Sequence, residues 1–289
     1  MTEPDPLIGS TIAGIRLDEM LGSGGMGTVY RGFQTGMARI VAVKILSEHL
    51  SSNAEYISRF RREAVTAGKL EHGNIVTIYD IGHEGGRYFI VMQYVEGRPL
   101  QRILDVVGPL PPREAASLMV GVLRGLQNAH AAGVVHRDIK PGNIIVTKEN
   151  EPKILDFGLA VGLDPRDRVT GTGSVLGTPL YISPEQARGK AAEPRSDLYS
   201  TGVMFYALLT GRVPFSGADP LAVLNMHIQE NPVSPINLNP RIPQALNDIV
   251  LKMLAKHPEE RHPNAEAAAR DIQSFLDGKL LALPPRPAP

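Results

Sequence analysis

The stretch HRDIKPGN, at residues 136–143, decides the fold predicted for this 289-residue chain. It follows a predicted helix that starts at Pro112 and stops at Gly133. Asp138 and Asn143 stand five positions apart in a loop that contains a proline, so the chain can turn both side chains toward one site. A carboxylate there can accept a hydroxyl proton, and an amide oxygen can ligate Mg²⁺, a hard ion that takes oxygen ligands. The stretch therefore predicts a catalytic loop.

A second acidic residue, Asp156, ends the apolar strand PKILD and begins the tripeptide DFG. An aspartate at the end of a strand is often only a turn residue, and the glycine after Phe157 lets the backbone turn sharply. Here, however, the aspartate comes thirteen residues after Asn143 of the HRDIKPGN loop. The combination favours a functional aspartate over a simple turn.

Upstream, the segment LGSGGMGTVY at residues 21–30 is rich in glycine. It fits the pattern G-x-G-x-x-G at Gly22, Gly24 and Gly27. A dinucleotide-binding loop would continue into a helix, whereas TVYRGF alternates like a strand. A P-loop would carry lysine where Thr28 stands. What remains is a β-turn-β segment, which is either an ordinary hairpin or a flap over a phosphate.

Lys44 ends VAVK within an apolar strand, where a lysine is costly to bury unless it is paired. Glu63 lies nineteen residues later, in the middle of a predicted amphipathic helix. Taken singly, these residues are typical of an edge-strand lysine and a solvated glutamate. Together they can form an ion pair that aims the ammonium group at the phosphates of a nucleotide.

The pattern of apolar residues divides the chain near residue 96. Before it, strands are predicted over most of residues 11–50 and 74–95, with one helix between them. After it, further helices are predicted near residues 195–211, 218–230, 243–256 and 264–277. The predicted organisation is a flexible arm (1–10), a β-rich lobe (11–95), a helical lobe (96–278) and a proline-rich tail or juxtamembrane linker (279–289).

Composition excludes several classes of protein. The 30 basic residues balance the 30 acidic ones, which gives no argument for binding nucleic acid or a membrane surface. There is no cysteine, so disulfides and thiol nucleophiles are excluded. No apolar run approaches the ~18 residues of a spanning helix, and the longest clear run, GVMFYALL, is typical of a buried helix. The N-terminus does not resemble a secretory signal. We therefore expect a soluble cytoplasmic chain without a membrane segment.

Taken in order, GSGGMG, VAVK, HRDIKPGN, DFG and SPE resemble the signature set of protein kinases. The resemblance covers about residues 11–277, and SPEQARG and RSDLYSTGVMFYALLTGRVPF are most similar to bacterial, eukaryotic-like (Hanks-type) serine/threonine kinases. It implies an α+β, bilobal protein-kinase fold, with a small antiparallel β-sheet lobe carrying one main helix and a larger, mostly helical lobe. It also implies ATP and Mg²⁺ or Mn²⁺ as cofactors, and proteins as substrates.

The resemblance implies a role for each matching residue in the β-rich lobe. Lys44 would contact the α- and β-phosphates, with Glu63 as its helix partner. Met92 stands at the gatekeeper position, and the backbone of residues 93–95 would hydrogen-bond adenine. The residues implied in binding ATP are Leu21, Gly22, Gly24, Gly27, Val29, Ala42, Lys44, Met92, Tyr94, Val95, Asn143 and Asp156.

In the helical lobe, Asp138 matches the catalytic base and Lys140 a lysine that contacts the γ-phosphate. Asn143 and Asp156 match the two metal ligands. Two further residues, Glu185 and Arg261, would pair and brace this lobe. The sequence departs from the family at Ser183, where the family more often has alanine, and this small departure is expected to leave the chemistry unchanged.

Between DFG and SPE the sequence carries Thr170, Thr172 and Ser174 in a glycine-rich segment. These hydroxyl groups are either ordinary polar groups of a loop or sites of autophosphorylation. Arg137, beside Asp138, is expected near this segment, and a phosphate pairs well with arginine. We expect Thr170 and Thr172 to be the main phosphorylation sites and Ser174 a weaker one.

Two other functions remain as alternatives. A small-molecule phosphotransferase of the aminoglycoside-kinase type would lack the glycine flap and Lys140. A pseudokinase scaffold would normally have lost Lys44, Asp138 or Asp156, all of which are present. The resemblance also suggests a homodimer formed through the β-rich lobe, and a full-length protein anchored in the membrane as a receptor kinase.

Overall fold

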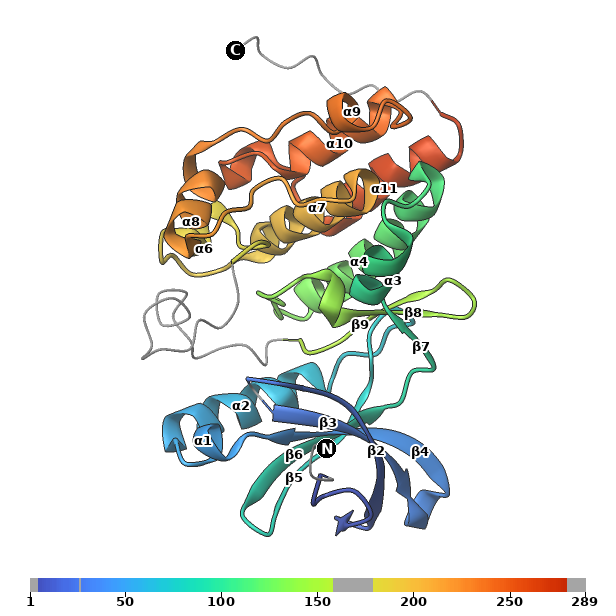
Figure 1. Cartoon of the computed structure of the whole chain (residues 1–289), viewed down its shortest axis with the longest axis vertical. Coiled ribbons are helices and arrows are strands. Elements are labelled where there is room, and N and C mark those ends of the chain that lie inside the picture. The colour runs from blue at the N-terminus through green and yellow to red at the C-terminus, as the bar shows by residue number, and fades with distance from the viewer. Residues whose placement is uncertain (1–4, 26, 158–178, 280–289) are drawn as a thin grey trace.

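The computed structural model of the chain describes residues 5–25, 27–157 and 179–279, and leaves out the side chains of Glu55, Arg59 and Glu63. Two lobes lie one above the other, a β-sheet lobe and a helical lobe (Figure 1). We call them the β lobe and the α lobe. This arrangement confirms the predicted α+β bilobal fold.

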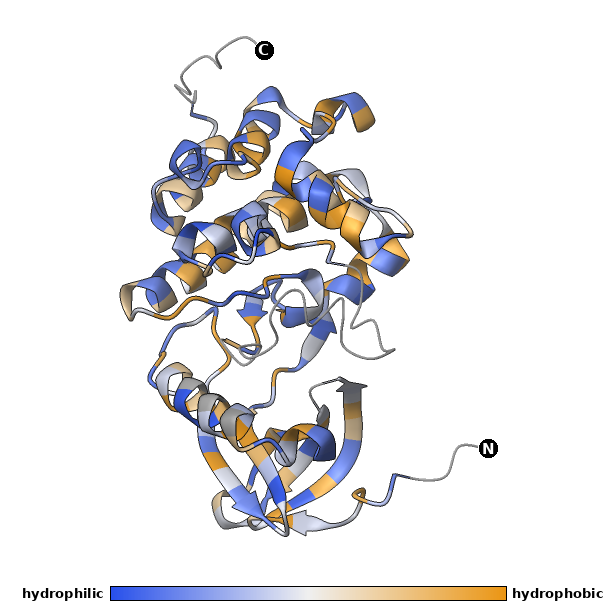
Figure 2. Cartoon of the chain, turned by 90° about the vertical axis from the view of Figure 1, so that its left-hand side faces the viewer, coloured by the Kyte–Doolittle hydropathy of each residue, from blue (hydrophilic) through white to orange (hydrophobic). Residues whose placement is uncertain are grey.

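The β lobe is a six-stranded antiparallel sheet in the order β1-β2-β3-β4-β6-β5. Its strands are β1 (Thr11–Ile12), β2 (Ile15–Gly24), β3 (Gly27–Gln34), β4 (Arg39–Leu46), β5 (Ile78–Glu84) and β6 (Arg87–Gln93). Hydrophobic and hydrophilic residues alternate along several of these strands (Figure 2), as expected for a sheet with one face in the core. Gly85 and Gly86 form the predicted turn between β5 and β6, with φ angles of 57° and 78°.

One main helix packs against this sheet. Helix α2 (Ala54–Ala67) follows the short helix α1 (Glu48–Ser51). Asn53 caps α2 by accepting a hydrogen bond from the backbone N–H of Tyr56 at 3.0 Å. Phe60 and Ala64 pack with Leu46 and Ile90 of the sheet in one buried cluster. Helix α2 is therefore the amphipathic helix predicted around Glu63, with Phe60 and Ala64 on its buried face.

Residues 5–10, the described part of the predicted arm, lie against the β lobe. The backbone N–H of Gly9 donates to the carbonyl of Leu17 at 2.8 Å. The Tyr30 hydroxyl donates to Asp5 Oδ2 at 2.7 Å. These contacts attach the start of the described chain to β2 and β3.

The α lobe is built around one buried helix, α7 (Pro194–Thr210), whose residues 196–209 are all buried. This burial confirms the meaning of the GVMFYALL run, since a helix that is apolar all round lies in a core. Proline occupies the first turn of α4, α6, α7 and α8, where its missing N–H costs nothing. The other α-helices among the described residues are α3 (Leu100–Val107), α4 (Pro112–Ala131), α6 (Pro184–Ala187), α8 (Pro220–Gln229), α9 (Pro235–Leu238), α10 (Gln244–Met253) and α11 (Ala265–Leu276).

In the described part of the chain, the backbone connects the lobes at two places. Residues 94–96 link β6 to a second, three-stranded sheet of β7 (Gly97–Pro99), β8 (Ile144–Thr147) and β9 (Pro152–Ile154). In addition, Ile75 forms a parallel bridge with Ile154. The N–H of Val76 donates to the carbonyl of Ile154 at 3.0 Å, and the N–H of Ile154 donates to the carbonyl of Asn74 at 2.9 Å. Residues 74–76 are thus attached directly to β9.

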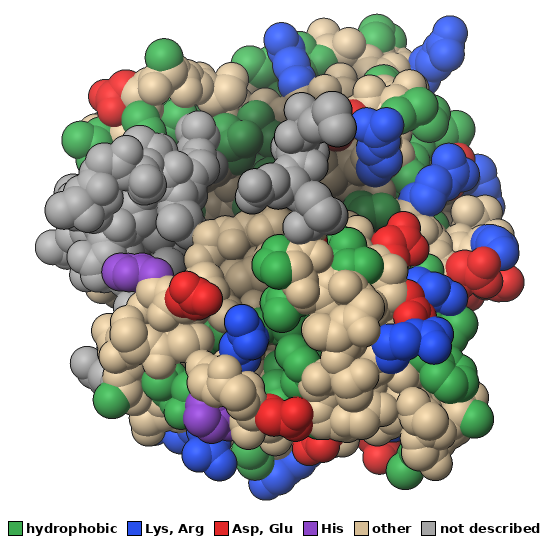
Figure 3. Space-filling model, turned by 60° about the horizontal axis from the view of Figure 1, so that its bottom comes forward, with side chains coloured by type: hydrophobic (Ala, Val, Ile, Leu, Met, Phe, Trp, Pro, Cys, Tyr) green, Lys and Arg blue, Asp and Glu red, His purple; other side chains and the backbone are tan. Residues whose placement is uncertain are grey.

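One face of the molecule carries charged side chains of both signs. At the end of the molecule formed by the β lobe, basic and acidic side chains are both scattered over the face (Figure 3). The 30 basic and 30 acidic residues of the whole sequence are in keeping with that mixture. Among the described residues, no helix combines the length and the apolar character that crossing a membrane requires.

Candidate active site

The glycine-rich segment forms the tip of the β2–β3 hairpin, where Gly24 pairs with Gly27. Gly27 has a φ of 144°, and a Cβ there would collide with the carbonyl of Ile45 in β4. A side chain at Gly22 would meet open space instead. Of the three glycines in the motif, Gly27 is therefore the one that the fold of the hairpin itself requires. Met26, at the tip, lies outside the described residues.

An apolar cluster lies beneath the sheet at the junction of the lobes. Four of its members are residues that the sequence assigns to the binding of ATP, and two are not. The cluster consists of Ala42, Val76 and Met92, with Val29, Val95 and Leu155 packed against them. It does not include Leu21, which is exposed on β2. Sequence reasoning missed Val76 and Leu155 because only the attachment of residues 74–76 to β9 brings them together.

Residues 94–96, which link the two lobes, are called the hinge below. Tyr94 of the hinge makes a different contact. The guanidinium group of Arg31, on β3, lies 5.8 Å from the centre of the Tyr94 ring. Arg31 also approaches Asp18 of β2 at 3.8 Å. These contacts connect the outer edge of the hinge to the strands that carry the glycine hairpin.

Lys44 crosses from the β lobe to the α lobe. Strand β3 pairs Val29 with Lys44, so the lysine lies beside the hairpin that carries the glycines. Its Nζ is 2.7 Å from Asp156 Oδ2, and the lysine is only 6% exposed. Asp156 has a φ of 57°, an uncommon conformation for a residue other than glycine. Glu63 lies on α2, but its side chain is not described, so the Lys44–Glu63 pair stays a prediction.

The HRDIKPGN loop turns its polar side chains toward one another, as its spacing predicted. Lys140 Nζ is 2.7 Å from Asp138 Oδ2. The side-chain amide of Asn143 donates to the carbonyl of Asp138 at 2.7 Å and to Asp138 Oδ2 at 3.2 Å. Because its Nδ2 is used in this way, the Oδ1 of Asn143 remains available as an acceptor.

A buried carboxylate supports this loop from below. Asp197, at the start of α7, accepts hydrogen bonds from the backbone N–H groups of His136 and Arg137, each at 2.8 Å. Its Oδ2 is also 2.8 Å from Nε2 of His130. Sequence reasoning did not assign Asp197 a role. A signal was present, because a carboxylate inside an apolar helix is costly unless it is hydrogen-bonded.

The strand that leads to Asp156 is tied to the same loop. The N–H of Leu155 donates to the carbonyl of Asn143 at 2.9 Å, and the ring of His136 lies 2.8 Å from the carbonyl of Leu155. Phe157 is buried, with its ring edge-on to His136 at 4.8 Å between centroids. These contacts hold Asp156 and the HRDIKPGN loop as one unit.

The side-chain oxygen atoms of Asn143 and Asp156 suit a hard divalent cation. The structure gives no hydrogen-bond partner to Asn143 Oδ1 or Asp156 Oδ1 among the residues that it describes. Mg²⁺ is usually held by one or two protein oxygens together with substrate phosphates and water. Within the described ranges no cluster of three or more His, Asp or Glu side chains could hold a metal alone. The arrangement therefore suits a metal that arrives with a polyphosphate.

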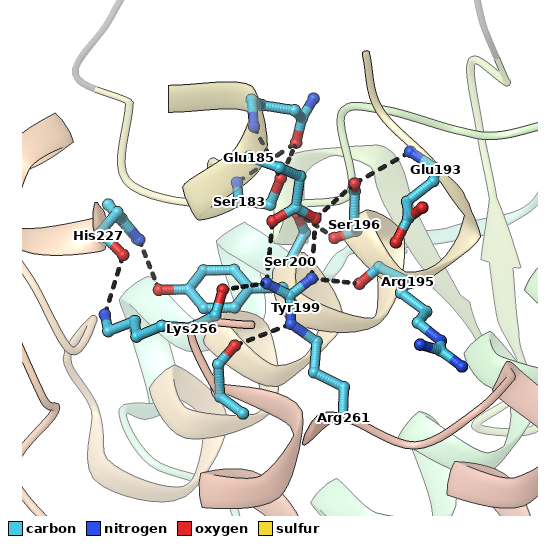
Figure 4. A network of polar contacts seen from close by, with 12 residues as sticks. Ser183, Glu185, Glu193, Arg195, Ser196, Tyr199, Ser200, His227, Lys256 and Arg261 are labelled. Carbon is cyan, nitrogen blue, oxygen red and sulfur yellow. Dashed lines mark hydrogen bonds and ion pairs between the residues drawn. The ribbon is translucent and has the colours of Figure 1, made fainter. Parts of the chain in front are cut away.

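A buried ion pair braces the α lobe, as the family resemblance implied. Arg261 donates to both carboxylate oxygens of Glu185, at 2.8 and 2.9 Å (Figure 4). Ser196 donates to the same carboxylate at 2.6 Å. Burial acts to raise the pKa of Glu185, but the hydrogen bonds from Arg261 and Ser196 outweigh it and leave this pKa below its ordinary value. Glu185 is thus kept ionised although it is buried.

A histidine lies at the far end of this network (Figure 4). His227, on α8, is fully buried, and the Tyr199 hydroxyl is 3.0 Å from its Nδ1. Burial, with a smaller effect of the nearby Lys256, lowers the pKa of His227 to about 3. Lys256 itself donates to the carbonyl of His227 at 2.9 Å. The neutral imidazole is therefore part of the packing between α7 and α8.

We expect the replacement His227→Gln to make the protein less sensitive to acid. The pKa of His227 in the folded state, about 3, lies below its ordinary 6.5, so between these values the unfolded chain binds more protons. Stability therefore falls as the pH falls, and one proton taken up on unfolding corresponds to about 1.4 kcal/mol per pH unit. Urea unfolding between about pH 7 and pH 5 measures the slope. Parallel curves for wild type and variant would contradict this role, and the exposed His257→Gln serves as the control.

Known proteins are similar to this chain over most of its length. The model of the protein kinase domain family matches residues 15–271. Serine/threonine-protein kinase PrkC of Bacillus subtilis is 42% identical over 276 residues, which cover 95% of this chain and 42% of that protein. Serine/threonine-protein kinase PknB of Mycolicibacterium smegmatis is 41% identical over 268 residues, 91% of this chain and 43% of that protein. The chain spans about two fifths of the length of these relatives.

A solved structure has the same architecture. The crystal structure of the Mycobacterium tuberculosis PknI kinase domain matches with a TM-score of 0.75 at 27% sequence identity. The match covers 94% of this chain and 98% of that one. Both lobes, and the site between them, are therefore included in the similarity.

Proposed function

Because the chain belongs to the protein kinase family, we propose that it transfers the γ-phosphate of ATP to serine and threonine hydroxyls of proteins. One observation carries this proposal. The site between the lobes combines the Lys44–Asp156 ion pair with the contacts of Asp138 to Lys140 and Asn143. Phosphoryl transfer asks mainly for such positioning and for neutralisation of charge. The names of the relatives support serine and threonine as the acceptors.

In this proposal, the apolar cluster and the hinge bind the adenine base of ATP. Ala42 and Val29 would cover one face of adenine, and Leu155, which packs in the same cluster, would cover the other. Met92 closes the back of the cluster, where it is 6% exposed. The backbone of residues 93–95 supplies the polar contacts to adenine. The glycine hairpin covers the phosphates, because its backbone can approach them without side chains in the way.

Each polar side chain of the site has a separate role in phosphoryl transfer. Asp138 orients the acceptor hydroxyl and takes its proton, and Lys140 balances negative charge at the γ-phosphate. Lys44 holds the α- and β-phosphates. When bound at Asn143 Oδ1 and Asp156, Mg²⁺ or Mn²⁺ supplies further neutralisation of the triphosphate charge. Glu63 remains the proposed partner of Lys44 on α2.

Activity and its regulation are tested in one experiment. We expect the purified chain, given Mg²⁺ and ATP, to phosphorylate myelin basic protein and to gain phosphate itself on Thr170 and Thr172, with less on Ser174. These three residues lie outside the described part of the structure. Intact-mass measurement and peptide mapping locate the phosphate. Transfer to the generic substrate with self-phosphorylation only at other residues would overturn the proposed sites but not the proposed activity.

The alternative function is a pseudokinase scaffold, which would bind partners without transferring phosphate. The same assay separates the two, because a scaffold shows no turnover in the presence of Mg²⁺ and ATP. A small-molecule phosphotransferase would transfer phosphate to an aminoglycoside and not to a protein. Pairing through the β lobe and membrane anchoring of the full-length protein stay predictions from the family resemblance, and a cytoplasmic location of this domain stays a prediction from the sequence.

A further inference from the structure

Ser183, at the position where the family more often has alanine, makes an unexpected set of contacts. It is fully buried at the N-terminus of α6. Its hydroxyl donates to Oε1 of Gln186 at 2.9 Å, and its backbone N–H reaches the same oxygen at 3.3 Å. The N–H of Gln186 returns to the Ser183 hydroxyl at 3.4 Å. Together these bonds form a capping box, in which the side chains of the first and fourth residues each satisfy the backbone of the other.

The Gln186 side chain also reaches outside its own helix. Its Nε2 donates to the backbone carbonyl of Arg137 at 3.0 Å, across 49 positions of sequence. Donor and acceptor chemistry fixes this orientation, because a carbonyl only accepts and the N–H of Ser183 only donates. With the amide turned the other way, both contacts would be repulsive. A cap needs only Oε1, so the bond from Nε2 to Arg137 is additional to the cap.

The carbonyl of Arg137 belongs to the peptide unit that joins Arg137 to Asp138. This unit is planar, so a bond to its carbonyl also orients its N–H. That N–H, the one of Asp138, donates to Nδ1 of His136 at 3.2 Å. Arg137 has a φ of 70°, a conformation that costs free energy in a residue other than glycine and persists only when neighbours enforce it. Asp197 holds one side of Arg137 through its N–H, and Gln186 holds the other through its carbonyl.

We propose that Gln186, oriented by Ser183, is a positioning residue that fixes the peptide unit on which the catalytic base Asp138 is mounted. This inference rests on the proposed kinase function. It assigns a role to Ser183. Besides the backbone N–H of Ser183, its hydroxyl is a second hydrogen-bond donor to Oε1 of Gln186, and it keeps this oxygen turned toward α6. The preceding residue, Glu185, is held by Arg261, so the segment that carries Gln186 is anchored independently of the catalytic loop.

The sharpest test is Gln186→Glu, which keeps the shape of the side chain and places an acceptor against the carbonyl of Arg137. We expect kcat to fall on the order of tenfold to a hundredfold, as for a catalytic group that is slightly misplaced. The KM for ATP should stay close to that of the wild type, because ATP is held by other residues. Gln127→Glu is the matched control, since among the described residues the Gln127 side chain bonds only through its Oε1, as an acceptor for the N–H of Glu266.

A second measurement does not depend on activity. Hydrogen exchange of the peptide spanning residues 134–143 should be faster in Gln186→Glu than in the wild type, with the rest of the α lobe unchanged. If the wild type transfers no phosphate but this exchange still increases, the kinase proposal fails and the coupling of Gln186 to the loop stands. Unchanged exchange overturns the inference, whatever happens to kcat, because Gln186 would then act elsewhere or only cap α6.

The contribution of Ser183 is separated by a double-mutant cycle. We expect Ser183→Ala alone to lower kcat by a few-fold. In a Gln186→Ala background, where no amide remains to be oriented, the same substitution should have no further effect on kcat. Equal effects of Ser183→Ala in both backgrounds would show that the hydroxyl acts independently of Gln186, and would overturn its assigned role.

Discussion

Asp138→Asn will retain the binding of ATP and lose on the order of 10²- to 10⁴-fold in kcat, the usual contribution of a general base. The substitution keeps the size of the side chain but removes the carboxylate that takes the proton. Asn143 can still donate to the backbone carbonyl at position 138, at 2.7 Å in the wild type. The loop should therefore keep its shape while losing its base.

Two measurements are needed to interpret this variant. Calorimetric titration with ATP and Mg²⁺ shows whether the nucleotide site is intact, and steady-state transfer to myelin basic protein gives kcat. Asp105→Asn on α3 is a suitable control, because Asp105 is an acceptor for Gln101 within its own helix. Near-normal turnover of Asp138→Asn would remove Asp138 from the role of catalytic base.

The second large effect is on stability. Arg261→Met should lower the free energy of unfolding by about 3–5 kcal/mol, the usual result of removing one partner of a buried ion pair. The reason is that Glu185, whose side chain is only 8% exposed, would be left as a buried charge facing no cation. Arg261 also donates to the backbone carbonyls of Ala255 and Arg195, which would lose a partner.

Urea unfolding measures this loss, and two further variants define its origin. In the double variant Glu185→Met/Arg261→Met, part of the stability should return, because the uncompensated charge is gone. The exposed pair of Arg270 and Glu266, with side chains 70% and 63% exposed, is the control. Arg270→Met should cost at most about 1 kcal/mol. A similar small cost for Arg261→Met would contradict the bracing role of the Glu185–Arg261 pair.

The sequence predicted features that depend on local pattern. The strands around the glycine hairpin, helix α2 and helix α4, which ends before Gly133, all follow from alternation, periodicity and capping. Helix α3 was missed although Leu100, Ile103 and Leu104 have helical spacing. Its eight residues are too short for periodicity to be decisive, and the segment follows Pro99 directly.

Contacts between distant segments could not be predicted in the same way. No local pattern links Lys44 to Asp156, 112 positions away, or places Asp197 beneath the catalytic loop. The Glu185–Arg261 pair was predicted only through the family resemblance. Ser183 shows the opposite case, in which a departure from the family pattern marked a residue whose contacts the structure then supplied.

The attachment of residues 74–76 to β9 constrains how the lobes can turn relative to each other. With residues 94–96 it gives two fixed points, and a rigid rotation that preserves both must have its axis on the line through them. Asp156 follows Ile154, where β9 is attached, by two residues and lies close to that axis. Gly27 pairs with Leu46, five residues along β4 from Val41, which pairs with Gln93 beside the hinge. At about 3.3 Å per residue, the glycine tip lies roughly 17 Å along β4 from the hinge. A rotation about this line leaves Asp156 next to the attachment at Ile154, whereas the glycine hairpin belongs to the lobe that turns.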